Sequence, residues 1–172
     1  MLKGLIDFLI SSTFEAKILR KNYIFFIIPM LNPDGIRYGN NRCSLLGVDL
    51  NRKWVKPNCI LHPTIYSTKA LLKHVHQERE ILMFTDFHGH SSQLNVFMYG
   101  CSYDYGEFDY LKKNSFIRIC PLLLSQLNPC FSYRDCSFSV EKAKSTTARI
   151  VAFKELNIQN SYTIEASYYG FL

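Results

Sequence analysis

A short apolar run that ends in a cluster of polar side chains limits what this chain can fold into. The run covers residues 81–85, and Asp86, His88 and His90 follow it directly. Such a run is typical of a buried β-strand, so the polar groups are expected at the strand's carboxyl end, where open α/β sheets bind ligands. A neutral imidazole there is a common zinc ligand, although a lone histidine is more often satisfied by a neighbouring carbonyl.

Other apolar runs predict further strands. Residues 23–28 are apolar on both faces and rich in β-forming residues, which is typical of a central strand covered by helices on both sides. Residues 161–165 predict a last strand that ends on a carboxylate, Glu165. Shorter runs at 95–99 and 136–140 predict two more strands, so we expect one sheet of several strands.

Helical patterns alternate with these runs. Residues 1–19 carry apolar side chains near helical spacing, with a polar interruption at residues 11–13. Three more helices are expected, over residues 64–80 with Thr64 as N-cap, 111–127 with a kink at Pro121, and 145–156. The alternation of helix and buried strand predicts an α/β fold in which helices cover both faces of the sheet.

Length and charge narrow the class of protein. The chain has 172 residues, enough for one domain, and a net charge of +6. A basic surface attracts nucleic acid, anionic membrane or acidic protein. The basic residues are scattered and form no arginine-rich tract, so nucleic acid is not an expected partner.

Cysteine spacing and the apolar runs bear on location. None of the six cysteines forms a Cys-x-x-Cys pair, so a structural zinc knuckle is not expected. The first 12 residues are too polar for a signal peptide, since Asp7 interrupts them. The longest apolar run, residues 24–31, contains Pro29 and is too short to cross a bilayer. We therefore expect a soluble, reduced, cytoplasmic protein that does not bind membranes.

Five polar motifs follow one another along the chain, each at or after a predicted strand end. They are Asn32-Pro33-Asp34-Gly35, Asn41-Arg42, Asp49-Leu50-Asn51-Arg52, Asp86-Phe87-His88 and Thr163-Ile164-Glu165. Each alone is common, but the five in this order resemble the zinc metallocarboxypeptidases of the carboxypeptidase A superfamily. The best match is its cytosolic carboxypeptidase branch, which trims glutamates from protein tails such as tubulin's. The matching stretches are residues 29–35, 42–52, 62–66, 87–91, 95–101, 136–138 and 161–165.

This resemblance implies a three-layer α/β/α fold with a mixed, largely parallel sheet and one zinc ion. His88 matches the family's third zinc ligand. Glu165 matches the general base, which takes a proton from the attacking water and passes it to the leaving amine. Arg42 matches the donor that stabilises the oxyanion. Asp86 and His90 are candidates for orienting His88, with a purely structural role as the alternative.

The resemblance also implies substrate-binding residues. Arg52, with Asn51 beside it, matches the pair that binds a terminal carboxylate, which a guanidinium can hold by two hydrogen bonds. Arg149 lies in the region that forms the side-chain pocket of the family, and is favoured over Lys142 or Lys144 as the cation that selects glutamate. Acidic protein C-terminal tails of the tubulin kind are therefore the expected partners.

The family's first two zinc ligands form a His-x-x-Glu motif before the Asn-Pro-Asp-Gly turn, and this sequence has no such motif. One histidine cannot hold a catalytic zinc ion, which needs three protein ligands. His74 and His76 do not replace the motif, because we expect them on the solvated side of a helix. Residues 1–172 are therefore expected to be the C-terminal portion of a catalytic domain whose N-terminal strands are missing.

Three functions are open on these grounds. The first is a zinc-dependent exopeptidase that removes C-terminal or branch-point glutamates. The second is a binding module without catalysis, in which Arg42, Arg52 and Arg149 form a cationic pocket for acidic tails. The third, a nucleic-acid binder, predicts salt-sensitive affinity, but no motif supports it. Because missing strands expose a sheet edge, marginal stability of residues 1–172 alone is also expected.

Overall fold

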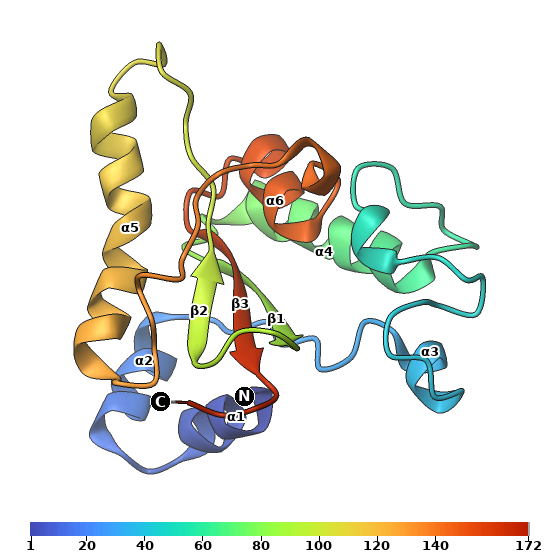
Figure 1. The fold of residues 1–172 in the computed structure, drawn as a ribbon, viewed down its shortest axis with the longest axis horizontal. Helices are drawn as coiled ribbons and strands as arrows, with labels where there is room; N and C mark the ends of the chain where they lie inside the picture. Colours follow the sequence, from blue (N-terminus) through green and yellow to red (C-terminus); the bar gives the residue numbers. More distant parts are fainter. Residues whose placement is uncertain (172) are drawn as a thin grey trace.

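The computed structural model describes residues 1–171, in which helices surround one small sheet (Figure 1). The helices are α1 Leu2–Ile10, α2 Phe14–Asn22, α3 Pro33–Arg37, α4 Pro63–Glu78, α5 Tyr110–Leu127 and α6 Ala148–Leu156, with single 3₁₀ turns η1 Leu50–Arg52 and η2 Lys142–Lys144. The strands are β1 Phe84–His90, β2 Val96–Tyr99 and β3 Ser161–Ser167. The α/β class predicted from the sequence is confirmed.

The sheet is mixed and has the strand order β1-β3-β2. β1 runs parallel to β3, with Phe84 opposite Ser161 at the start of the ladder, and β2 runs antiparallel to β3. β3 is rich in aromatic and β-branched residues, which favour strands, and its first three residues are buried. The last strand in the sequence is therefore the central strand of the sheet.

Helices cover both faces of β3, because its successive side chains point to opposite sides. On one face, the Tyr162 hydroxyl donates a hydrogen bond to the Ile117 carbonyl of α5 at 2.6 Å. On the other, the Ser161 hydroxyl donates to the Arg149 carbonyl of α6 at 2.7 Å. Figure 1 shows α5 on one side of the strands and α6 with α4 on the other. These contacts produce the three layers expected from the alternating pattern.

A buried lysine joins α4, α6 and the chain that follows η1. Lys69 of α4 donates hydrogen bonds to the carbonyls of Trp54 at 2.8 Å and Val55 at 2.7 Å, and forms an ion pair with Glu155 of α6 at 2.7 Å. Its side chain is 7 % exposed. A buried ammonium group is tolerated when its donors are satisfied, as here. Lys69 therefore fixes the segment that begins with η1 against the two helices.

The predicted helix over residues 1–19 is two helices, α1 and α2. Thr13 is the N-cap of α2, and its hydroxyl accepts a hydrogen bond from the Ala16 amide at 3.4 Å. Arg20 donates hydrogen bonds to the carbonyls of Leu9 and Ser11, at the end of α1 and just beyond it. The polar interruption in the sequence is thus where the chain turns.

The strand predicted over residues 23–28 is not formed. Those residues take part in no ladder within the described chain, and several of their large apolar side chains are exposed, with Ile24 61 % and Phe26 55 % exposed. A strand needs a hydrogen-bonded neighbour, and β1 is paired with β3 alone in residues 1–171. The apolar pattern therefore marks strand propensity, but pairing decides whether a strand exists.

Pairing also changes other predicted boundaries. β1 begins at Phe84, whose amide donates to the Asn160 carbonyl at 2.9 Å, because β3 provides no partner for residues 81–83. Residues 136–140 form no strand and contribute a single bridge between Tyr99 and Ser137. Thr64 lies inside α4 and donates to the Leu31 carbonyl at 2.7 Å, so it is not the N-cap.

The predicted helix over residues 111–127 is confirmed as α5, which continues through Pro121. The helix predicted over residues 145–156 begins later, at Ala148. No helix within residues 1–171 has the length and apolar character needed to cross a membrane.

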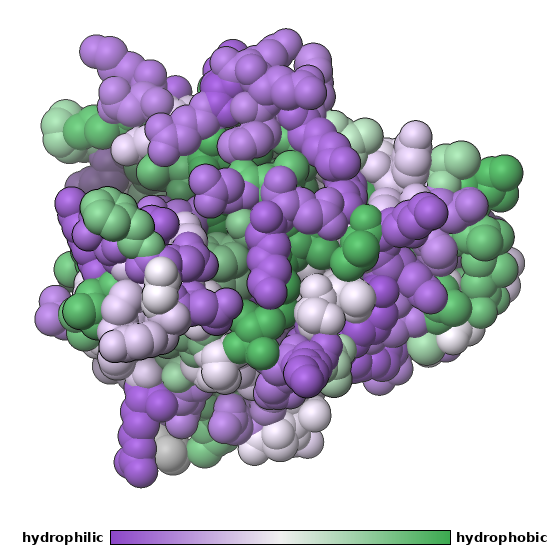
Figure 2. Space-filling view, turned by 90° about the horizontal axis from the view of Figure 1, so that it is seen from above, coloured by the Kyte–Doolittle hydropathy of each residue, from purple (hydrophilic) through white to green (hydrophobic). Residues whose placement is uncertain are grey.

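The surface of the molecule is mixed in character. Figure 2 shows apolar residues exposed in several places among hydrophilic ones on the face seen from above.

Candidate functional site

The register of the sheet brings the central histidine and the last carboxylate together. His88 of β1 lies directly opposite Glu165 of β3, and Asp86 lies opposite Thr163. Directly opposed residues project to the same face of a sheet and have Cβ atoms about 5 Å apart. The two residues are far apart in sequence, yet they form one pair near the carboxyl ends of parallel strands.

His88 is held by a short polar network. Its Nε2 atom lies 2.8 Å from Oδ2 of Asp86 and 3.3 Å from Nδ2 of Asn51. Burial lowers the pKa of His88, but the hydrogen bond to Asp86 and the carboxylates of Asp86, Glu165 and Asp49 outweigh it, so the pKa is raised. Asp86 therefore orients the ring, as carboxylates do for metal-binding histidines.

Asn51 connects η1 to both α6 and β1. Its Oδ1 accepts a hydrogen bond from the Ala148 amide at 2.9 Å, and its Nδ2 donates to Asp86 at 3.2 Å. Ala148 is the first residue of α6, so Asn51 satisfies one of the amides that a helix start leaves unpaired. The side chain predicted to bind substrate is thus a fixed link between elements distant in sequence.

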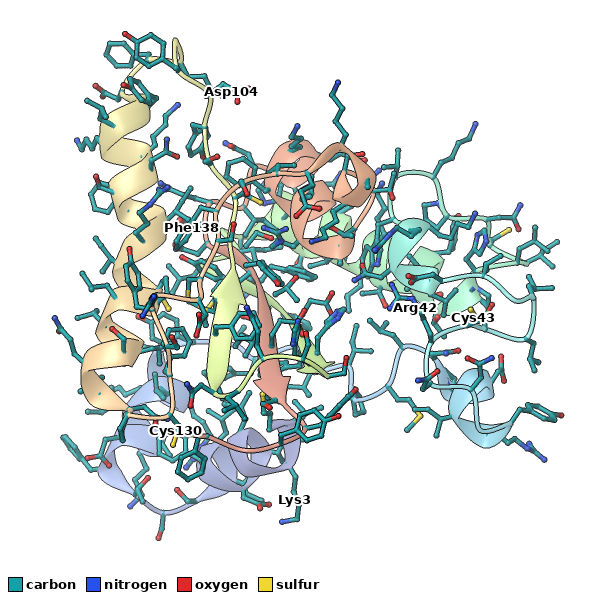
Figure 3. The ribbon with its side chains drawn as sticks, viewed as in Figure 1. Lys3, Arg42, Cys43, Asp104, Cys130 and Phe138 are labelled. Atoms are coloured by element: carbon teal, nitrogen blue, oxygen red, sulfur yellow. The ribbon has the colours of Figure 1, made fainter. Side chains whose placement is uncertain are left out.

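Asp49 forms ion pairs with both arginines of the expected site, Arg42 and Arg52. Its Oδ2 lies 2.9 Å from Nη2 of Arg42 and 3.9 Å from Nη1 of Arg52, and its Oδ1 accepts from the Asn51 amide at 2.9 Å. Figure 3 labels Arg42 beside Cys43, in the chain between α3 and α4. The Arg42 side chain is 66 % exposed, so its ion pair contributes little to stability.

The position of Arg42 depends on the Asn-Pro-Asp-Gly turn. Asn32 caps α3, its Oδ1 accepting from the Gly35 amide at 3.1 Å, and its Nδ2 donates to the Cys43 carbonyl at 3.1 Å. A Cβ at Gly35 would lie 2.6 Å from that same carbonyl oxygen. The motif therefore requires glycine there, because the chain leading to Arg42 passes too close for a side chain.

Glu165 is the buried carboxylate of the site, with 8 % of its surface exposed. Burial raises the pKa of Glu165, nearby Asp86 raises it further, and His88 and His90 partly oppose the shift. A carboxylate with a raised pKa is a stronger base than one in water. The residue therefore has the environment expected for a group that accepts a proton.

Arg149 is buried at the start of α6 and is 3 % exposed. Its Nε and Nη1 atoms have no hydrogen-bond partner within residues 1–171, and its Cζ lies 5.8 Å from the centre of the Tyr99 ring. Burial lowers its pKa. Burying guanidinium N–H groups without hydrogen-bond partners is costly, and such groups are able to bind an anion.

The lysines weighed against Arg149 are placed differently. Lys144 pairs with Glu141 at 3.1 Å, and its side chain is 37 % exposed. Lys142 lies beside it in η2. No hydrogen bond or ion pair within residues 1–171 joins Arg149 directly to Arg42, Arg52 or Glu165.

The other histidines considered in the sequence lie in two places, His90 on β1 and His74 and His76 on α4. His90 lies on the same face as His88 and contacts the Phe97 ring, with centroids 5.2 Å apart. His74 is exposed on α4 and pairs with Glu78 at 3.5 Å, and His76 is exposed too. The prediction that His74 and His76 are solvated helix residues is confirmed.

The roles of two side chains were not predicted from the sequence. Asp49 is the first residue of the motif at 49–52, and its place between Arg42 and Arg52 in the sequence is the signal that it could pair with both. Tyr99 lies within the family-like stretch of residues 95–101, but nothing in the sequence indicates that its ring contacts Arg149. Contacts between a strand and a helix that follows much later in the chain depend on topology.

A zinc site can be tested against these residues. Within residues 1–171, no three His, Cys, Asp or Glu side chains lie together as a metal-binding group. His88 is one candidate ligand, whereas a catalytic zinc ion needs three protein ligands. The described residues therefore do not fit a complete zinc site.

The fold is that of the metallocarboxypeptidases. It matches a metallo-carboxypeptidase from Burkholderia cenocepacia with a TM-score of 0.79 at 22 % identity, over 96 % of this chain and 43 % of that one. A putative carboxypeptidase A from Shewanella denitrificans gives the same TM-score at 25 % identity and the same coverage. The family model for zinc carboxypeptidases matches residues 1–172. The chain belongs to the zinc carboxypeptidase family.

Curated relatives identify the branch it resembles. Cytosolic carboxypeptidase 1 of Xenopus laevis is 46 % identical over 99 % of this chain and 15 % of that protein. Cytosolic carboxypeptidase 4 of Homo sapiens is 47 % identical over 99 % of this chain and 16 % of that protein. The chain thus spans about a sixth of the length of these relatives.

Proposed function

We propose that this protein is a zinc-dependent carboxypeptidase that removes C-terminal or branch-point glutamates from acidic protein tails such as tubulin's. Family membership and the cytosolic carboxypeptidase relatives support the proposal. The observation that carries it is the pairing of His88 and Glu165 across β1 and β3. The names of the relatives also support a cytoplasmic location.

Glu165 is proposed as the group that moves the proton. Peptide hydrolysis requires a base that accepts a proton from the attacking water and returns it to the leaving amine. Glu165 is buried, has a raised pKa and lies beside His88. These properties support its assignment as general base.

The arginines are proposed to bind the negative charges of the substrate and of the reaction. Arg42 is assigned to the oxyanion, because a cationic donor stabilises the charge that develops on the scissile carbonyl oxygen. Arg52 and Asn51 are assigned to the terminal carboxylate. Asp49 contacts both arginines, which supports their acting at one place.

Specificity for glutamate is assigned to Arg149. Its unpaired Nε and Nη1 atoms and its burial support a role as partner of an acidic side chain. A net charge of +6 is compatible with an acidic protein tail as substrate. Nucleic acid and membranes are not proposed as partners.

Zinc is the cofactor that the family implies, and when bound it would polarise the scissile carbonyl and acidify the attacking water. His88 is the candidate ligand in this chain. Because residues 1–171 do not complete the site, the roles proposed here concern the proton, the oxyanion and the carboxylates.

A glutamate-tailed peptide tests the proposal in the complete protein with zinc supplied. Glu165→Gln should lower turnover about 1,000-fold with the fold retained, because it removes the proton acceptor. Glu78→Gln, on the exposed side of α4, is the matched control and should leave turnover unchanged. Arg52→Ala should chiefly raise KM. Unchanged turnover in Glu165→Gln would contradict the assignment.

The buried Nε and Nη1 atoms of Arg149, which have no hydrogen-bond partner within residues 1–171, also support a second candidate function, a binding module for acidic tails. In that case Arg42, Arg52 and Arg149 still form the cationic site. Peptide binding without zinc uptake and without cleavage distinguishes this function from the first. Zinc uptake at one ion per protein, measured by metal analysis, supports the enzyme instead.

A further inference from the structure

The aromatic ring of Tyr99 contacts the most deeply buried cation of the site. Arg149 places its Cζ atom 5.8 Å from the ring centre, within the range of a cation–π interaction. Its Nε and Nη1 atoms have no hydrogen-bond partner in the described chain. The Tyr99 ring therefore stabilises part of the buried charge of Arg149 and leaves the Nε and Nη1 donors of Arg149 unoccupied.

The sheet also places Tyr99 near the buried carboxylate of Glu165. Tyr99 of β2 lies opposite Thr163, so its side chain is on the same face as Glu165, one diagonal position away. Burial raises the pKa of Tyr99, and the charges of Glu165 and Glu141 raise it further while Lys144 and Arg149 lower it. The phenol is therefore neutral at physiological pH, and its surroundings contain both the base and Arg149.

Lys144 is a second cation near the Tyr99 ring, and unlike Arg149 it has an acidic partner. Lys144 places its Nζ atom 5.2 Å from the Tyr99 centroid, but also pairs with Glu141 at 3.1 Å. Lys144 is partly exposed, whereas Arg149 is 3 % exposed. Arg149 thus depends on the ring more than Lys144 does.

We propose that Tyr99 is a positioning residue that sets acidic side-chain specificity by holding the Arg149 guanidinium. The ring attracts the cation through its face, which leaves the Nε and Nη1 donors of Arg149 for a carboxylate. The chemical class selected is a residue with a side-chain carboxylate, against its neutral amide. This inference rests on the proposed function, because it assumes that Arg149 meets the substrate.

The test compares peptides that end in glutamate with peptides that end in glutamine. In the complete protein with zinc supplied, Tyr99→Leu should reduce the Glu-over-Gln ratio of kcat/KM about tenfold. The reduction should come chiefly from a higher KM for the glutamate peptide. A factor of about ten is what the loss of a desolvated cation–π contact would cause. Tyr99→Phe keeps the ring and should keep the ratio. Arg149→Gln should abolish the preference.

Tyr103→Leu is the matched control. Tyr103 also carries a cation, Lys113 at 4.7 Å from its ring centre, and packs on Phe153 of α6 with centroids 4.9 Å apart. Tyr103 lies in the segment that connects β2 to α5, next to Asp104, which Figure 3 labels near the loop at the start of α5. Its replacement should lower stability and leave the Glu-over-Gln ratio unchanged.

The outcomes separate the inference from the proposed function. The inference alone is overturned if Tyr99→Leu leaves the Glu-over-Gln ratio of kcat/KM intact while Arg149→Gln abolishes the preference. It is also overturned if Tyr99→Leu lowers kcat/KM equally for both peptides. A wild-type protein that cleaves and binds neither peptide overturns the proposed function and this inference with it. If Tyr99→Leu does not fold, fluorinated phenylalanines at position 99 weaken the ring's negative face at nearly constant shape, and the ratio should fall in step with fluorination.

Discussion

Residues 23–28 and the strand β3 are both apolar, β-forming stretches, yet within residues 1–171 the first is exposed and the second is the centre of the sheet. Phe26 is 55 % exposed, whereas Tyr162 is fully buried. β3 has a strand on each side and a helix on each face, and residues 23–28 have no ladder partner within residues 1–171. An apolar sequence therefore supplies the tendency to form a strand, and its neighbours in the fold decide whether that strand becomes part of the core.

The largest predicted effect contrasts these two stretches directly. Tyr162→Ala should lower the free energy of unfolding by about 4 kcal/mol, because it removes a large buried ring and leaves a cavity. In a protein of residues 1–172, Phe26→Ala should change it by less than about 0.5 kcal/mol, because the ring is exposed there. Chemical denaturation followed by circular dichroism measures both. If the two losses were equal, residues 23–28 would be packed as tightly as β3.

A second prediction concerns the buried lysine. Lys69→Met keeps the length of the side chain but leaves the Trp54 and Val55 carbonyls without their donor. We expect a loss of about 2–3 kcal/mol in unfolding free energy, the usual cost of unsatisfied buried groups. Lys73→Met, on the exposed side of the same helix, is the control and should be nearly neutral. A neutral Lys69→Met would show that water replaces the ammonium group.

A third prediction concerns a charge added to the exposed residues 23–28. In a protein of residues 1–172, Ile24→Lys should change the free energy of unfolding by less than about 0.5 kcal/mol, because the side chain is 61 % exposed. It should also reduce self-association at high concentration, since exposed apolar patches promote contacts between molecules. Analytical ultracentrifugation measures the second effect. A large destabilisation would mean that this segment is covered in solution.

The smallest effect is on reactivity and leaves stability unchanged. Burial raises the pKa of Cys101 to about 11, and its side chain is inaccessible, whereas Cys59 is exposed. At pH 8, iodoacetamide should therefore modify Cys59 quickly and Cys101 only after unfolding. Mass spectrometry of peptides from the native protein gives both rates. Comparable rates would place Cys101 at the surface.

Much of the fold follows from patterns that are local in sequence. The helix at 111–127 and the strands near 95–99 and 161–165 were predicted because their periodicity agrees with their environment. The strand expected at 23–28 is absent because pairing is a property of two segments, and one apolar run cannot report it. Residues 136–140 show the same limit, with a single bridge in place of a strand.

The candidate site divides in a similar way. Residue types and motif order indicated His88, Glu165 and Arg149, and the register places the first two together. The cap that Asn51 provides to α6 could not be predicted, because it joins segments that only the topology brings near. The roles of these residues in catalysis and binding stay predictions for the experiments above.

The opposition of His88 and Glu165 also limits how this protein can vary. Each strand alternates its side chains, so inserting or deleting one residue inside β1 would turn one member of the pair to the other face. Changes in length are tolerated far better in the loops that connect the strands, because those loops do not set the register. We therefore expect evolutionary insertions and deletions to collect between the strands and to spare Phe84–His90 and Ser161–Ser167.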